Sequence, residues 1–498
     1  MGSLEFPPVV RLGPLDQIAP RIYVRSVFVF SLEPTASNSS SICNHLQHRF
    51  QAALLRWPFL AGQIRPAARH GKKNYLELAY DVDEILLNVA KRPDIFRYTT
   101  SATLGGYTYQ ELKQSGMPPS IMDKDILSLS PNHPQPGESC PPVTLKVTEL
   151  RDGGLFACFS THHAIFDGGF IKAFLEYVGN QMTPPSQPFL PFLMEANNRP
   201  SMSPYLNTNI ENAIFPEYDF TAKTDLIPTM RSLTMNDFHA SRLTNKPRAV
   251  CFLFQFKNST LKNLHGRALG YVGIKYGKNA FVSKIDVLSG LVWVHTTRAR
   301  LPHLSPADRT SFTTAADART RLDPKYPSDA WGNIYTQTTA GTTVNDLLWL
   351  WNTPEETSSL DPFPCICEAA WLIRQAVEKV NRPEYIPQRI ALAASLEDPT
   401  KEGTAFRKAL QPDHAGLGCS VWAHMGADVD FGIPGTGGKA VYIRKTWSAN
   451  DGSMNIMQRR GVTKGDAPWE VLLALREDDM QRICEREELG RWATSWCA

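Results

Sequence analysis

Two adjacent histidines stand close to an aspartate in the stretch STHHAIFDGG, residues 160–169. Asp167 follows His163 by four residues, and Gly168 comes directly after the aspartate. Histidine has a pKa near neutrality, so a histidine exposed at a strand end can take a proton from an incoming hydroxyl or amine. The pattern is therefore compatible with general-base catalysis, with a metal site, or with a hydrogen-bonded turn that merely contains histidine.

The spacing disfavours a metal site formed by His162, His163 and Asp167. Neighbouring residues that leave an extended strand point to opposite faces, so both imidazole rings cannot easily reach one ion. One histidine would then act as the base while the other serves structure, and we expect no bound metal. Taken alone, the motif leaves both catalysis and a structural turn open.

The elements around the motif place it between a strand and a helix. Residues 141–150 and 154–163 are rich in β-branched and apolar side chains and predict two strands joined by the turn RDGG. After the motif, residues 169–182 repeat apolar side chains at helical spacing, with Phe170 and Phe174 on one face. The histidines are thus expected at a strand-to-helix turn.

Composition and charge restrict the function. A chain of 498 residues predicts two or three domains, with an interior large enough to bury catalytic groups. Its net charge of +3 argues against nucleic acid and acidic membrane surfaces as partners. No apolar run approaches the roughly 18 residues that a membrane-spanning helix needs. The nine scattered cysteines and the lack of a leader sequence predict a reducing, cytoplasmic location.

Strand and helix patterns alternate along the whole chain, which predicts a mixed α/β fold. Proline-dense residues 183–204 are typical of a crossover between two halves, and we place the boundary at residue 215, giving lobes 1–215 and 216–498. In the second lobe, Ser283 is expected to cap a helix over residues 283–300. Further strands are expected at 21–32, 74–82, 248–258 and 439–447, and further helices at 39–57, 366–383 and 469–489.

Three other motifs are disfavoured by the residues around them or are not present. Residues 435–440 fit G-x-G-x-x-A, but a strand pattern follows where a dinucleotide fingerprint needs a helix, so a glycine hairpin is the better interpretation. Cys365 and Cys367 have no second Cys or His pair at zinc-site spacing and are interpreted as buried free thiols. The sequence G-x-S-x-G is not present, which removes the usual serine-hydrolase elbow.

The chain resembles the BAHD acyltransferases, especially the fungal members that acylate secondary metabolites. The family signature HxxxDG stands at residues 163–168, and the first three residues of the second signature, DFGWG, stand at 430–432, about 260 residues later. Smaller likenesses lie at 12–25, 57–66, 282–300 and 315–333. The two signatures occur in the family's order, which makes the pair far more specific than either signature alone.

The resemblance implies an α/β (mixed α+β) fold of two similar chloramphenicol-acetyltransferase-like lobes, joined by a long crossover loop, with the active-site channel between them. Acyl-CoA would enter the channel from one side as the co-substrate and a small-molecule acceptor from the other. His163 would remove the acceptor's proton during attack on the thioester and then protonate the departing CoA thiolate. The resemblance implies direct transfer, without an acyl-enzyme.

Further roles follow from the resemblance alone. Asp167 would pair with an arginine to orient the loop, and Gly168 would allow the tight turn there. Arg319 lies in an arginine segment similar to one in the family and is otherwise interpreted as part of an inter-domain ion pair. The residues implied beside the reacting carbonyl are Ser420 and Trp422, and those implied near CoA are Ser283, Lys284, Asp430, Phe431 and Gly432.

The residues themselves leave the donor and the acceptor open. Acetyl-CoA is expected as the donor because acetyl transfer is the commonest reaction among fungal relatives, and a hydroxyl of a secondary metabolite is expected as the acceptor. A monomer is expected. A condensation-domain-like enzyme that uses a carrier-bound thioester or an amine acceptor is an alternative, and so is a catalytically silent small-molecule binding protein on the same scaffold.

Overall fold

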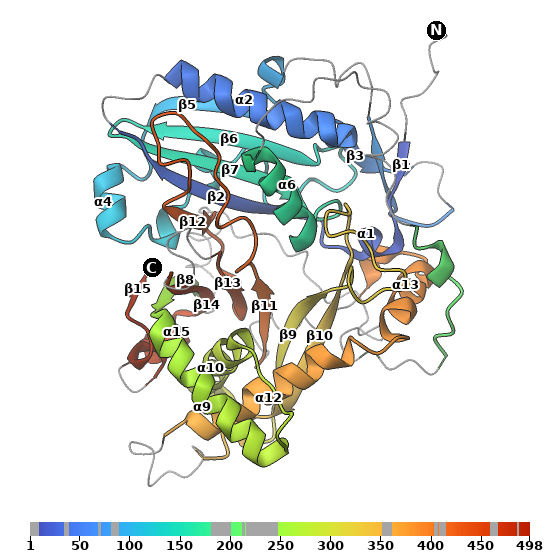
Figure 1. Ribbon diagram of the computed structural model, residues 1–498, viewed down its shortest axis with the longest axis vertical. Coiled ribbons are helices and arrows are strands. Elements are labelled where there is room, and N and C mark those ends of the chain that lie inside the picture. The colour runs from blue at the N-terminus through green and yellow to red at the C-terminus, as the bar shows by residue number, and fades with distance from the viewer. Residues whose placement is uncertain are drawn as a thin grey trace.

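The fold is that of a computed structural model, which describes residues 9–33, 39–67, 71–80, 89–180, 201–211, 215, 248–350, 361–402, 407, 415–458, 467–485 and 488–498. Two large sheets, each built mainly from one half of the sequence, organise these residues (Figure 1). Most of the expected crossover at 183–204 lies outside the described residues.

The N-terminal lobe is built on a five-stranded sheet. Its strand order is β12 (Tyr442–Lys445), β2 (Tyr23–Ser31), β7 (Gly154–His162), β6 (Val143–Leu150) and β5 (Phe96–Ala102). Helices α2 (Ser39–Arg56) and α6 (Gly168–Asn180) cover one face of this sheet (Figure 1). β7 is the central strand, and all nine of its residues are buried. The strand that leads to the histidines is therefore held on both edges and both faces.

The side chains of β2 alternate between two apolar clusters. Phe28 and Phe30 belong to a core that includes residues of α2 and α6, while Val27 and Val29 face a second cluster with Tyr109 of α4 (Tyr109–Gln114). This period of two is expected for a strand buried on both faces. Full burial of an apolar side chain of this size stabilises the fold by about 2 kcal/mol, so the alternation fixes the register of the sheet.

One strand of the N-terminal sheet comes from the second half of the sequence. β12 pairs antiparallel with β2, with Lys445 opposite Ser26 and Tyr442 opposite Val29. The two lobes therefore share a hydrogen-bonded strand in addition to apolar contacts. The division at residue 215 stays a prediction, because residues 216–247 lie outside the described part of the chain.

The C-terminal lobe contains a seven-stranded sheet. Its strand order is β10 (Tyr335–Thr343), β9 (Arg309–Asp317), β11 (Leu417–Val421), β13 (Ser453–Ile456), β14 (Trp469–Arg476), β8 (Ala249–Phe256) and β15 (Ser495–Cys497). Helices α9 (Asn258–Tyr276), α10 (Lys284–Ala299) and α12 (Phe363–Lys379) share a core with Phe254 and Phe312 on the outer face of the sheet. Leu253 and Leu472, on the opposite face, belong to the core of the N-terminal lobe.

Shorter elements complete the described part of the chain. A small sheet contains β1 (Val9–Arg11), β4 (Leu76–Ala79) and β3 (Gln63–Pro66). The short α-helices are α1 (Pro14–Ile18), α5 (Lys124–Leu127), α11 (Val344–Leu347), α13 (Tyr385–Ser395) and α15 (Glu477–Ile483). The 3-10 helices are η1 (Pro58–Ala61), η2 (Val89–Lys91), η3 (Pro119–Ile121), η4 (Ser203–Tyr205), η7 (Leu301–His303), η8 (Pro399–Lys401) and η9 (Leu489–Arg491). Within the described residues, no helix is long and apolar enough to cross a membrane.

The mixed α/β fold with two lobes is confirmed, and one predicted element is wrong. Ser283 caps α10, since its hydroxyl accepts a hydrogen bond from the Asp286 N–H at 3.1 Å. The helix expected at 469–489 is instead strand β14 followed by the short helix α15. The run WEVLLAL lies buried between β13 and β8, and a short apolar run does not distinguish a buried strand from a buried helix.

Candidate active site

His163 is the first residue after β7, where the chain leaves the sheet. Its N–H donates to the carbonyl of Ile22 at 2.8 Å, just before β2, and its carbonyl accepts a hydrogen bond from the Asn333 side chain at 2.8 Å. Both backbone groups of this residue are therefore fixed, one by each lobe. The side chain is half-buried, and its ring centroid lies 5.8 Å from that of Tyr335, the first residue of β10.

One nitrogen of the His163 ring is enclosed by the protein. Nδ1 is buried and makes no hydrogen bond among the described residues. Burial lowers the pKa of His163 below its ordinary value, and the residue's own carbonyl, the Asp167 charge and the Asn333 side chain oppose that shift. The ring is therefore mainly neutral at pH 7, which is the form that a general base needs.

The preceding histidine is enclosed by the fold. His162 is buried, its ring meets the Tyr23 ring edge-on at 5.2 Å between centroids, and its Nδ1 accepts a hydrogen bond from the Ala164 N–H at 3.2 Å. Burial lowers the pKa of His162 to about 3, and the neighbouring His163 acts in the same direction. His162 is therefore a neutral packing residue of the turn.

Asp167 forms a bidentate ion pair with Arg319. The two guanidinium nitrogens donate to the two carboxylate oxygens at 2.9 and 2.8 Å, and both side chains are almost fully buried. Each oxygen accepts one further hydrogen bond, from the N–H of Ile334 at 2.8 Å or the N–H of Phe170 at 2.9 Å. The carboxylate thus joins the start of α6 to the C-terminal lobe.

Close packing explains the two glycines that follow Asp167. A Cβ atom on Gly169 would lie 2.5 Å from a guanidinium nitrogen of Arg319, a distance that real Cβ atoms do not adopt, so the ion pair requires glycine here. A Cβ atom on Gly168 would lie 3.1 Å from the sulfur of Met425. Since the N–H of Met425 donates to the carbonyl of Trp422 at 2.9 Å, Gly168 brings the turn after β11 against the start of α6.

A second buried carboxylate, that of Asp16, holds Asn333 in place. One oxygen of Asp16 accepts hydrogen bonds from the N–H of Asn333 at 2.7 Å and from its side-chain amide at 3.2 Å, and the same amide donates to the His163 carbonyl. Neither Asp16 nor Asn333 is predicted as a site residue from the sequence. Both lie in segments that carry the family resemblance, and a polar residue in an apolar segment is the signal that marks them.

Ser420 and Trp422 lie at the end of β11 in the C-terminal sheet. Ser420 is half-buried and stands opposite Asn455 of β13, so their side chains share one face of the sheet. Trp422 lies two residues further along and belongs to the core of the N-terminal lobe. Both residues therefore face the N-terminal lobe, as Tyr335 does beside His163.

The second signature forms a loop anchored on the N-terminal sheet. Phe431 is buried against phenylalanines of β2 and β7, and its carbonyl lies 2.7 Å from Nε2 of His45. Asp430 and Gly432 are exposed, and the Asp430 carboxylate accepts a hydrogen bond from the Gly432 N–H at 2.9 Å. An isolated bridge pairs Asp430 with Lys439, so residues 430–439 close a hairpin-like loop, as the glycine pattern predicts.

Ser283 and Lys284 lie where α10 begins. Ser283 and Asp286 exchange hydrogen bonds in a capping box, and Asp286 also pairs with Arg374. α10 packs on the outer face of the C-terminal sheet, opposite the face that carries Ser420. The described contacts therefore account for Ser283 as a cap and do not join it to the residues around His163.

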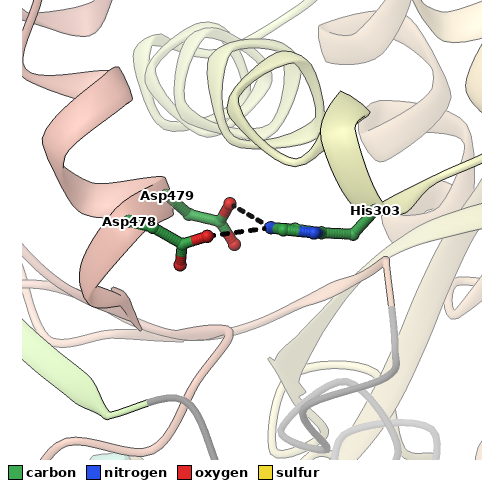
Figure 2. A group of neighbouring side chains, drawn as sticks. All are labelled: His303, Asp478 and Asp479. Atoms are coloured by element: carbon green, nitrogen blue, oxygen red, sulfur yellow. Dashed lines mark hydrogen bonds and ion pairs between the residues drawn. The ribbon is translucent and has the colours of Figure 1, made fainter.

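Within the described residues, one group of potential metal ligands lies between η7 and α15. Nε2 of His303 is 3.1 Å from an oxygen of Asp478 and 3.2 Å from an oxygen of Asp479, and Figure 2 shows both carboxylates turned toward the ring. Arg482 pairs with both carboxylates as well. A guanidinium already supplies the positive charge that a metal ion would bring, so we interpret the group as an ion-pair network.

Comparison with known proteins identifies relatives along nearly the whole chain. The sequence model of the Transferase family matches residues 110–489. Acyltransferase easC of Emericella nidulans is 27% identical over 339 residues, 66% of either chain. The trichothecene 8-O-acetyltransferase of Fusarium sporotrichioides is 23% identical over 503 residues, 97% of either chain. The crystal structure of F. sporotrichioides TRI101 complexed with coenzyme A and T-2 matches the fold with a TM-score of 0.72 at 17% identity, over 98% of this chain and 99% of that chain.

Proposed function

Because the chain belongs to the Transferase family, the BAHD acyltransferases, we propose that it transfers an acyl group from coenzyme A to a hydroxyl of a small-molecule acceptor. The family match spans both the histidine motif and residues 430–432. TRI101, whose fold this chain shares, binds coenzyme A together with T-2, which supports a two-substrate site. We place that site in a channel between the lobes, at His163.

His163 is the proposed general base. Its Nε2 accepts the proton of the acceptor hydroxyl while the oxygen attacks the thioester carbonyl carbon. As the C–S bond breaks, the imidazolium returns this proton to the CoA sulfur, so that ester and free CoA leave without a covalent enzyme intermediate. The observation that carries this role is the fixing of both His163 backbone groups by different lobes, with Nδ1 buried and the ring neutral.

Ser420 and Trp422 are proposed to flank the reacting carbonyl. The Ser420 hydroxyl has no hydrogen-bond partner among the described residues and lies on the face turned toward the N-terminal lobe, where it could donate to the developing oxyanion. Asp167 and Gly168 act by positioning the histidine loop. The residues proposed for contact with CoA, on the basis of the family resemblance, are Ser283, Lys284, Asp430, Phe431 and Gly432.

Acetyl is the proposed acyl group, and a secondary metabolite is the proposed acceptor. A relative matched over 97% of the chain is named as a trichothecene 8-O-acetyltransferase, which favours both acetyl transfer and a hydroxyl acceptor. The backbone of His163 is fixed by two segments of the same chain, which favours a monomer as the active unit.

Thioester consumption tests the proposal directly. The purified protein is incubated with acetyl-CoA or longer acyl-CoAs and an extract of small hydroxylated molecules, and CoA release is measured with a thiol reagent while products are identified by mass spectrometry. We expect CoA release that depends on the acceptor, with a product heavier by one acetyl group, and its loss in His163→Ala. Turnover only with a carrier-bound thioester or an amine would support the condensation-type alternative, and binding of acceptors without any turnover would support a silent binding protein.

A further inference from the structure

A row of mostly polar side chains crosses the face of the C-terminal sheet that meets the N-terminal lobe. Ser420 stands opposite Asn455, and the same register leads through the small side chain of Ala315 on β9 to Gln337 of β10, two residues from Tyr335. Residues opposite one another in a sheet share a face, as do residues two apart along one strand. The row therefore runs from Tyr335, beside His163, to Asn455, and the side-chain oxygen of Gln337 within it is buried without a hydrogen-bond partner.

Lys445 reaches the far end of this row from the shared strand β12. Its ammonium donates to the side-chain oxygen of Asn455 at 3.2 Å, and the residue is half-buried. Among the described residues, no carboxylate pairs with Lys445. The adjacent Arg444 differs, because it pairs with the carboxylate of Glu470 at 3.0 Å across the same lobe boundary. The fold thus neutralises one of two neighbouring cations and leaves the other with a neutral amide only.

The charges near Lys445 do not compensate it. Burial lowers the pKa of Lys445. The Cys251 thiol opposes that shift, and the positive charge of Arg25 adds to it. Arg25 is itself 4% exposed, and one of its terminal nitrogens has no hydrogen-bond partner in the described part of the protein. An uncompensated cation withdrawn from water is unfavourable, and a bound anion would relieve this cost.

We propose that Lys445, together with Asn455, binds a carboxylate on the acceptor and makes the enzyme selective for hydroxy acids. This inference rests on the proposed function, because it assigns a binding site to the end of the acceptor that lies away from the hydroxyl at His163. One ammonium beside a neutral amide matches the single charge of a carboxylate. The phosphates of CoA carry several negative charges, for which one half-buried lysine is a poor match.

Strand geometry gives the separation that the acceptor must span. Asn455 and Tyr335 are three strands and two residues apart, so their Cα atoms are separated by roughly 16 Å at about 4.8 Å per strand and 3.3 Å per residue. The Lys445 ammonium contacts Asn455 at one end of this span, and the His163 ring lies beside Tyr335 at the other. We expect a fitting acceptor to have its hydroxyl and its carboxylate on the order of 10 Å apart.

Matched acids and esters test the inference. The probes are 4′-hydroxybiphenyl-4-carboxylate, 10-hydroxydecanoate and their methyl esters, with acetyl-CoA as donor. We expect kcat/KM for the better acid to exceed that for its ester by at least about tenfold, the scale of a charged hydrogen bond. Lys445→Gln should lower kcat/KM for the acid by a similar factor. It should leave kcat/KM for the ester and the KM for acetyl-CoA nearly unchanged. Lys445→Arg should recover part of the loss. Lys262→Gln, which removes an exposed charge from α9, should behave as the unaltered protein.

Two outcomes overturn the inference. One is an unaltered protein that prefers neither acid over its ester, and the other is a Lys445→Gln variant whose defect lies in the KM for acetyl-CoA, which would assign the lysine to CoA. Calorimetric binding of the same probes without acyl-CoA separates this inference from the proposed function. Acid-selective binding that is lost in Lys445→Gln supports the carboxylate site even if no acyl transfer occurs, and a failure of transfer alone contradicts only the proposed function.

Discussion

The two carboxylate oxygens of Asp167 face the two terminal nitrogens of Arg319, 152 residues later in the sequence, in a buried pair that connects the lobes. Both oxygens also accept backbone hydrogen bonds, so the carboxylate is fully engaged in holding the turn. This arrangement differs from a catalytic triad, in which the carboxylate accepts from the histidine ring. Asp167 therefore acts on His163 through the loop and through a modest charge effect on its pKa.

Asp167→Asn should lower stability and activity together. Removing one partner of a buried ion pair costs about 3 to 5 kcal/mol, because the Arg319 charge is left uncompensated. The melting temperature, measured by differential scanning fluorimetry, should fall strongly, while the acidic limb of the pH–rate profile of the folded enzyme should move by less than about one pH unit. The control is Asp317→Asn, since Asp317 contacts Arg319 at 3.1 Å but is half exposed, and such pairs contribute at most about 1 kcal/mol. A stable Asp167→Asn protein with a limb moved by a full unit would indicate direct coupling instead.

His163→Ala should remove catalysis and leave the fold intact. The ring is half-buried at the end of β7, and the backbone hydrogen bonds of this residue do not depend on its side chain. We expect kcat to fall by roughly 10²-fold or more, the usual scale for a lost general base, with melting temperature and CoA affinity near those of the unaltered protein. Since the pKa of His163 is lowered, the acidic limb of the unaltered enzyme should lie below pH 6.5. Activity at the original rate in His163→Ala would exclude the mechanism.

Asn333→Asp should impair turnover by setting a second carboxylate against Asp16. The amide of Asn333 links the Asp16 carboxylate to the His163 carbonyl, and an aspartate cannot donate these hydrogen bonds. We expect kcat to fall by roughly 10-fold or more with little change in either KM, because the effect is on the orientation of His163. The double variant Asp16→Asn with Asn333→Asp exchanges the two groups and should recover part of the stability. Equal KM increases for both substrates in the single variant would argue for a binding role.

Acidification should destabilise the protein through His162. Above pH 6.5 this ring is neutral in the folded and unfolded chains, but between pH 6.5 and about 3 only the unfolded chain binds the proton. The free energy of unfolding should therefore fall as the pH falls, by up to about 1.4 kcal/mol per pH unit from this group. His162→Asn keeps an acceptor for the Ala164 N–H and removes the titration. Thermal melts from pH 7 to 4 should show a shallower decline for this variant, and parallel declines would assign the effect to other groups.

Chelators should leave activity unchanged. At the turn before His163, the His162 ring packs against Tyr23 and is not available as a ligand. Near His303, Arg482 already contacts both carboxylates and takes the place of a metal ion. Dialysis against EDTA followed by the CoA-release assay measures this directly, with elemental analysis of the purified protein alongside. One tightly bound zinc or iron ion per chain, together with loss of activity on its removal, would contradict the prediction.

Local patterns predict the strand-to-helix turn well, because the apolar run of β7 and the helical spacing of α6 are each contained in fewer than 20 residues. The cap at Ser283 is local in the same way. Partners across the lobes are not predictable from such patterns. The resemblance implies an arginine partner for Asp167, and Arg319 stands out in its own segment, yet nothing in the sequence joins the two residues.

The missed features all depend on contacts between distant segments. β14 forms a strand because β13 and β8 offer it two edges, whereas its apolar run fits a helix equally well. Asp16 and Asn333 are 317 residues apart, so their pairing is visible only in the fold. From the sequence, Lys445 is one charged residue in a predicted strand, and its neutral partner Asn455 is known only from the structure.

The shared strand β12 sets an order for folding during synthesis. β2 is complete at residue 31, but its outer edge is covered only when residues 442–445 have been made. At about 5 to 20 residues per second this delay is roughly 20 to 80 seconds. During that interval the nascent chain carries an open strand edge, a template for pairing with other chains. The sheet of the N-terminal lobe, although its first strand is synthesised early, is therefore completed only when nearly the whole chain has been made.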